Sequence, residues 1–75
     1  MNPTQPLSAA ELLARNLRHL REERGLTIDD LARLTGIAAA RLDGIERATA
    51  QVRLDELSLL ARGLDVRIAV LFAVE

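Results

Sequence analysis

Leucine recurs at intervals of three and four residues along much of this chain, and this spacing constrains the fold more than any other feature. Residues separated by three or four positions lie on the same face of an α-helix. Leu13, Leu17 and Leu20 form one such apolar face, and a second runs from Leu54 to Leu60. The sequence therefore predicts amphipathic helices that pack on one another.

Capping residues and glycines divide the chain into four predicted helices. Ser8 precedes Glu11 at the spacing of a capping box, and a glycine such as Gly25 is typical of a helix end. Similar start and stop signals recur further along the chain. We expect helices from Ser8 to Gly25, from Thr27 to Gly36, from Ala38 to Arg47 and from Leu54 to Gly63, with residues 48–53 as a polar connection.

Residues 66–75 have a different pattern. Apolar residues, several of them β-branched, alternate from Val66 to Val74, which is typical of a β-strand. Helical spacing also fits part of this tail, so a short fifth helix is the alternative. Either form leaves apolar side chains that need burial, and we expect them to form the interface of a homodimer. The predicted dimerisation residues are Val66, Ile68, Val70, Leu71, Phe72 and Val74.

These patterns give the chain three parts. We expect a flexible N-terminal segment over residues 1–7, a helical domain over residues 8–65 and a dimerisation tail over residues 66–75. A chain of 75 residues forms one small domain, and such a domain buries only about 60% of its unfolded surface. Added stability from a partner chain is therefore expected.

Composition argues against several classes of function. The chain has no cysteine and a single histidine, His19, so we expect no disulfide, metal site or cofactor. It also lacks tyrosine and a glycine-rich phosphate loop, so an enzyme is not expected. It has neither a basic leader nor a long apolar run, which predicts a cytoplasmic protein with no membrane partner. Because the net charge is −1, any binding to nucleic acid must come from local groups of arginines.

Two short predicted helices, joined at Thr35, Gly36 and Ile37 and packed on a longer first helix, describe a helix-turn-helix. From Leu12 to Val66 the chain resembles the Cro/CI-type (XRE) helix-turn-helix family, through its Gly-Leu-Thr, Gly-Ile and Ile-Glu-Arg elements. The resemblance implies an all-α, lambda-repressor-like domain of four helices that binds double-stranded DNA. The tail is similar to that of persistence-type antitoxins, which pair a strand across the dimer, and of restriction-modification controller proteins, which end in a helix.

The resemblance also indicates which residues face DNA. In the family the second short helix enters the major groove, and its base-reading positions correspond here to Ala39, Ala40, Arg41 and Gly44. Of these, Arg41 alone is long enough to donate two hydrogen bonds to guanine, so we expect it to be the base reader, with a phosphate contact as the alternative. The alanine methyl groups can meet thymine methyls, or they can simply favour the helix.

Further contacts follow from the same resemblance. It implies phosphate contacts around the end of the recognition helix and the loop after it, and a salt bridge between Arg21 and Glu46 that tethers this helix to the first one. Asp43 is expected to act as a cap or as the partner of an arginine. The predicted DNA-binding residues are Thr27, Ala38, Ala39, Ala40, Arg41, Gly44, Arg47, Thr49, Gln51 and Arg53.

The sequence therefore predicts a homodimeric, sequence-specific transcriptional regulator, a repressor that binds a palindromic operator. The alternative is an antitoxin that neutralises a cognate toxin, or another protein-interaction module with a weakened DNA-reading surface. This alternative is motivated by the loss of polar side chains at three base-reading positions, by the slightly acidic balance and by the apolar tail.

Overall fold

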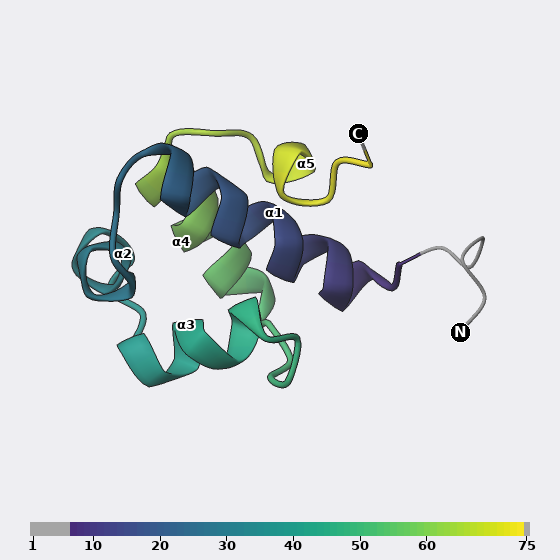
Figure 1. The fold of residues 1–75 in the computed structure, drawn as a ribbon, viewed down its shortest axis with the longest axis horizontal. Coiled ribbons are helices and arrows are strands. Elements are labelled where there is room, and N and C mark those ends of the chain that lie inside the picture. The colour runs from purple at the N-terminus through teal and green to yellow at the C-terminus, as the bar shows by residue number, and fades with distance from the viewer. Residues whose placement is uncertain (1–6, 75) are drawn as a thin grey trace.

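Five helices form within residues 7–74, the part of the chain that this computed structural model describes. They are α1 (Ala9–Glu23), α2 (Ile28–Thr35), α3 (Ala39–Glu46), α4 (Leu54–Leu64) and α5 (Ile68–Leu71), shown in Figure 1. The all-α prediction is confirmed. The expected flexible segment 1–7 lies outside the described residues except for Leu7, as does the last residue of the predicted tail. Within residues 7–74, no helix combines the length and the apolar character that crossing a membrane requires.

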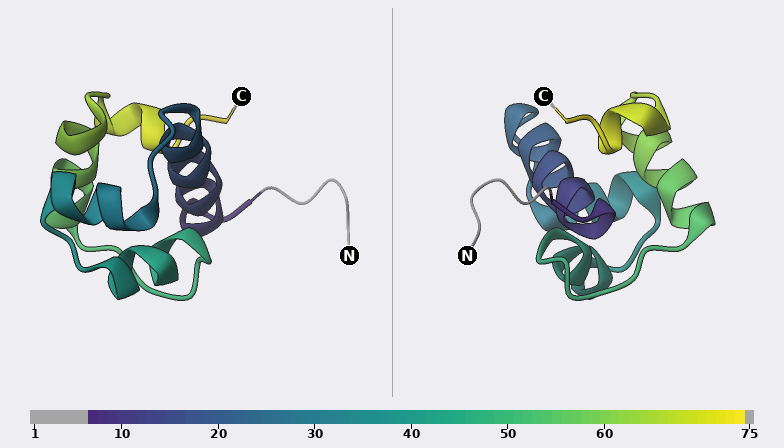
Figure 2. Two further views of the ribbon diagram at one scale, coloured as in Figure 1. Left: turned by 60° about the vertical axis from the view of Figure 1, so that its left-hand side comes forward. Right: turned by 90° about the vertical axis from the view of Figure 1, so that its right-hand side faces the viewer.

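The helices surround one apolar core. α1 contacts both α3 and α5, and α2 packs against α3 and α4. α3 and α5 lie on opposite sides of the domain in both views of Figure 2. The leucine faces predicted from the sequence point inward, because the fully buried side chains include Leu13, Leu17, Leu31, Leu42, Ile45, Leu60, Leu64 and Leu71.

Local capping signals set the first two helix starts. The Glu11 N–H donates to the Ser8 hydroxyl at 3.1 Å, and the Ser8 N–H donates back to the Glu11 carboxylate at 2.8 Å. Thr27 and Asp30 make the same reciprocal pair at 3.0 and 2.9 Å. Both pairs satisfy backbone donors that a helix start would otherwise leave unpaired.

The prediction that the fourth helix ends at Gly63 is wrong. α4 continues to Leu64, and Asp65 takes the left-handed conformation at its end with φ of 57°. A Cβ added at Gly63 would lie only 2.8 Å from Cγ2 of the buried Thr35. This glycine therefore serves the close approach of α4 to the end of α2, and not a helix cap.

The tail forms the helical alternative, and the expected strand is absent from residues 66–74. The Val70 N–H donates to the Arg67 carbonyl at 2.9 Å, and the Phe72 N–H donates to the Ala69 carbonyl at 3.2 Å. This turn directs Leu71 into the core, where it is fully buried. The Asn16 amide of α1 donates to the carbonyls of Leu71 and Ala73 at 2.9 Å each, and so satisfies the end of the turn.

Candidate nucleic-acid interface

α3 presents a nearly uncharged first turn to solvent. Ile37, Leu42 and Ile45 hold the helix against the core, while Ala38 and Ala40 are exposed and Ala39 is half-buried. No side chain caps the start of α3 at Ala38, in contrast to α1 and α2. The exposed residues at this helix start, Ala38 and Ala40, therefore carry only methyl groups, and the one charged side chain of the first turn is that of Arg41.

An ion pair fixes the other end of α3 to α1. Arg21 Nε lies 2.7 Å from one Glu46 oxygen, and its Nη2 lies 3.0 Å from the other. The two side chains are only 14% and 5% exposed, and the hydrogen bond to Glu46 raises the pKa of Arg21. Arg21 also donates to the Leu26 carbonyl at 2.8 Å, and Arg18 donates to the Glu46 carbonyl at 2.9 Å. The structure thus contains the expected tether between the two helices.

Arg41, the expected base reader, makes an ion pair within the protein. Its Nε donates to Glu56 of α4 at 2.6 Å and its Nη2 donates to the second Glu56 oxygen at 2.8 Å. Nη2 also donates to the Gln51 carbonyl. The Arg41 side chain is one-third exposed, whereas that of Glu56 is 3% exposed. The sequence placed Glu56 at the start of the fourth helix, but nothing in the sequence paired it with Arg41.

The surroundings of Glu56 stabilise its charged form. The hydrogen bonds from Arg41 lower the pKa of the Glu56 carboxyl to about 2, and they outweigh the opposing effect of burial. The Arg53 N–H also donates to this carboxylate at 2.8 Å and lowers its pKa further. Glu56 is therefore a buried anion at neutral pH, with partners on α3 and at the start of α4.

The loop between α3 and α4 carries the remaining polar candidates. Arg47, Thr49, Gln51 and Arg53 are all exposed, and the Arg47 and Arg53 side chains are each 70% exposed. The Arg47 guanidinium lies 3.1 Å from the Asp43 carboxylate, so the partner of Asp43 is an arginine. These two arginines are accessible to a phosphate backbone.

Two other predicted DNA-binding residues have internal roles. A Cβ added at Gly44 would lie 3.0 Å from the Ala50 side chain, so this position packs against the loop. Thr27 is exposed at the start of α2, where its hydroxyl accepts the Asp30 N–H. The structure therefore brings Thr27 to the surface but turns Gly44 toward the chain itself.

The tail on the other side of the domain is partly apolar and accessible. Ile68, Val70 and Val74 are 41%, 39% and 75% exposed. Leu71 is fully buried in its own chain, so the prediction that it contacts a second chain is wrong. Val66 and Phe72 are partly buried against the core.

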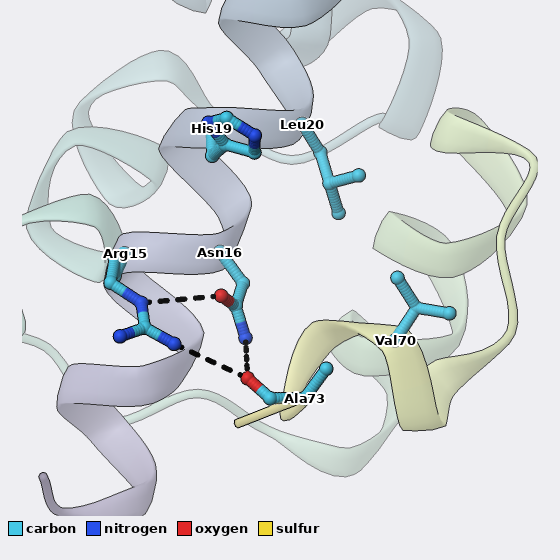
Figure 3. A pocket seen from close by; sticks show the side chains of 6 residues that line it. All are labelled: Arg15, Asn16, His19, Leu20, Val70 and Ala73. Atoms are coloured by element: carbon cyan, nitrogen blue, oxygen red, sulfur yellow. Dashed lines mark hydrogen bonds between the residues drawn. The ribbon is translucent and has the colours of Figure 1, made fainter. Parts of the chain in front are cut away.

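Beside these residues, α1 and the tail border an open pocket of about 400 Å³ (Figure 3). Its wall is mainly apolar and includes Leu20, Val70 and Ala73, while Arg15 and Asn16 bind the tail carbonyls at its edge. His19, also on this wall, lies 3.1 Å from Glu23 on α1.

Comparison with known proteins places this geometry among helix-turn-helix proteins. The helix-turn-helix family HTH_3 matches residues 17–71. The structure is similar to that of an HTH_3 family transcriptional regulator from Vibrio cholerae, with a TM-score of 0.82 and 34% identity over 85% of this chain. The match spans only 36% of that regulator's length.

Two smaller proteins match over most of their own length. The restriction-modification controller protein C.AhdI from Aeromonas hydrophila is 33% identical, with a TM-score of 0.81 over 84% of this chain and 96% of its own. The hypothetical transcription factor NHTF from Neisseria is 25% identical, with a TM-score of 0.85 over 97% of this chain and 87% of its own. No curated protein has significant sequence similarity to this chain.

Proposed function

Because the chain belongs to the HTH_3 family of helix-turn-helix proteins, we propose that it is a DNA-binding transcriptional regulator whose α3 enters the major groove. The observation that carries this proposal is the exposed face of α3, held outward by the buried pair of Arg21 and Glu46 and flanked by exposed arginines. A tethered helix keeps its orientation as it enters the groove, which sequence readout requires.

Phosphate contacts supply most of the proposed affinity. Arg47 and Arg53 neutralise phosphates, while Thr49, Gln51 and Thr27 can hydrogen-bond to the DNA backbone from exposed positions. Because the whole chain has a net charge of −1, this local group must act at short range, and salt should weaken binding steeply.

Base discrimination is proposed to be modest. The methyls of Ala38, Ala39 and Ala40 can contact thymine methyls, and small side chains let the helix backbone lie close to the base edges. Sequence-dependent DNA shape adds to this. A guanine contact by Arg41 would require that its guanidinium leave Glu56.

The exposed tail supports a homodimer as the active form. Ile68, Val70 and Val74 are accessible apolar side chains. The helix α5, which carries the first two, lies on the side of the domain away from α3 (Figure 2). Twofold symmetry would present two α3 helices to half-sites about 34 Å apart, and hence to a palindromic operator. We propose that the dimer acts in the cytoplasm as a repressor. Among the contacts of residues 7–74, none specifically favours the antitoxin alternative or a toxin partner.

A fluorescence-anisotropy titration with a random-sequence duplex at several salt concentrations tests this function. We expect binding that weakens with salt, and we expect an Arg47→Gln/Arg53→Gln variant to reduce the magnitude of the slope of log affinity against log salt by about 2 for each bound protomer, and so by about 4 for the homodimer. The matched control, Arg62→Gln/Arg67→Gln, removes two exposed arginines from the end of α4 and the start of the tail and should change the slope less. Absence of binding by the wild-type protein at low salt would refute the proposal.

A further inference from the structure

We infer that Arg41 is a positioning residue and not a base-reading one: together with Glu56 it fixes the loop that carries the phosphate-binding side chains. This inference rests on the proposed function for its consequence in DNA binding. The claim that Arg41 and Glu56 fix the loop is argued from contacts within the protein without DNA.

While its bonds within the protein hold, Arg41 does not have two free nitrogens to donate to a guanine base. Bidentate readout uses two nitrogens of one guanidinium to reach the O6 and N7 atoms of the base. In Arg41, Nε and Nη2 both donate to Glu56, and Nη2 also donates to Gln51. While these bonds hold, Nη1 is the one Arg41 nitrogen without a hydrogen-bond partner among the described residues, so a two-nitrogen contact with guanine requires that Nη2 or Nε leave its protein partner.

Few backbone hydrogen bonds hold the second half of the loop, where Val52 packs partly buried against the core. Thr49 and Ala50 donate backbone hydrogen bonds to the Gly44 carbonyl at 2.9 and 3.2 Å. Within residues 7–74, no backbone–backbone hydrogen bond involves Gln51 or Val52. This part of the loop is held instead by the bond from Arg41 to the Gln51 carbonyl and by the bond from the Arg53 N–H to Glu56.

Glu56 connects these contacts. Its buried carboxylate binds Arg41 of α3 and the Arg53 backbone, and the Arg53 side chain approaches it to 3.7 Å. A guanidinium that left for DNA would leave a nearly unexposed carboxylate without its main partner, which is unfavourable. The pair should therefore persist when DNA is bound, and it should preset Gln51 and Arg53 for phosphate contacts.

Amide hydrogen exchange and binding-site selection together test this inference. The variants are Arg41→Met and Arg41→Met/Glu56→Gln. The double variant leaves no unpaired buried carboxylate and retains an acceptor for the Arg53 N–H, so it keeps the test open if the single variant fails to fold. The matched control is Arg33→Met, which removes an arginine from α2 whose partner, Asp30, lies on the same helix.

We expect exchange of the Arg53 amide, whose N–H donates to Glu56, to accelerate by about tenfold or more in both Arg41 variants, since a hydrogen bond from a charged donor that fixes this part of the loop is lost, and to stay unchanged in the control. Selection from a random duplex pool should return the same preferred sequence as the wild-type protein, with affinity reduced by one common factor for all duplexes.

Unchanged exchange in the loop would overturn the positioning role. Loss of preference at a single base position in the Arg41 variants would instead assign Arg41 to base reading. If the wild-type protein bound no DNA, the proposed function would fail, while the exchange measurement would still decide whether Arg41 fixes the loop.

Discussion

Acid should destabilise this protein through Glu56 in particular. The hydrogen bonds from Arg41 lower the pKa of the Glu56 carboxyl from an ordinary value of 4.5 to about 2. A carboxyl whose pKa is lower in the folded state contributes its full stabilisation above the unfolded pKa, and this contribution is lost as pH falls through the folded pKa. The window for Glu56 therefore runs from about pH 5 down to pH 2. The difference between its two pKa values corresponds to about 3 kcal/mol of unfolding free energy.

Urea denaturation followed by circular dichroism between pH 7 and pH 2 measures this contribution. At pH 7 we expect Glu56→Gln to lower the free energy of unfolding by about 3 kcal/mol, because the neutral amide cannot form the charged pair with Arg41. The difference between wild type and variant should shrink as pH falls below 4.5, since the carboxyl of the unfolded wild-type chain takes up its proton there while that of the folded protein takes it up only near pH 2. Asp55→Asn is the control, because it removes the same charge one position away, from a side chain that is 73% exposed and whose ion pair with Arg53, at 3.7 Å, lies in solvent.

A difference between wild type and Glu56→Gln that stayed constant from pH 7 to pH 2 would refute this reasoning. The same would hold if Asp55→Asn reproduced the pH dependence of Glu56→Gln, since the effect would then come from net charge and not from the buried pair.

Three further substitutions test other parts of the fold by urea denaturation. Ala48 has a φ of 59°, which is strained for a residue with a side chain. Ala48→Gly should therefore raise the free energy of unfolding by about 0.5–1 kcal/mol, because the relief of this strain exceeds the entropy cost of glycine. A decrease would contradict the strain argument. Gly63→Ala should lower the free energy of unfolding by about 1–2 kcal/mol, because the new Cβ would lie 2.8 Å from Thr35 and the better helix propensity of alanine offsets only part of the clash. An increase would show that α2 shifts at little cost to make room for the methyl group. Arg21→Met should cost about 3–5 kcal/mol by leaving Glu46 buried without its partner, and Arg21→Met/Glu46→Gln should cost less. Equal losses in these two variants would locate the effect in packing instead of charge.

Local signals in the sequence predicted most of the helical framework. The capping pairs that begin at Ser8 and Thr27 act over three residues, and Gly36 takes the left-handed conformation that ends α2. Such effects depend on neighbours in the chain, so they can be read before the fold is known. The ion pair between Arg21 and Glu46 could be named only because the resemblance supplied its register.

Tertiary packing decided what the spacing of residues left open. The tail fits both a strand and a helix by its pattern, and the helical turn forms where Leu71 fills the core and Asn16 binds the carbonyls that follow. Gly63 resembles a helix stop in the sequence, but contact with Thr35 from another helix explains its small size.

The candidate interface also has features that local sequence signals predicted and features that only tertiary packing decided. From the sequence alone, Arg41 is the one long donor at the base-reading positions of the recognition helix. Only the fold brings it to Glu56, fifteen positions away, where burial makes a charged partner necessary for the carboxylate. The sequence by itself determined the first four helices and the face that α3 exposes, because these follow from the spacing of apolar residues and, in α1 and α2, from side-chain caps. The tertiary structure decided that Arg41 pairs with a buried carboxylate while the Arg47 and Arg53 side chains stay exposed, because such pairing depends on distances that the sequence does not contain.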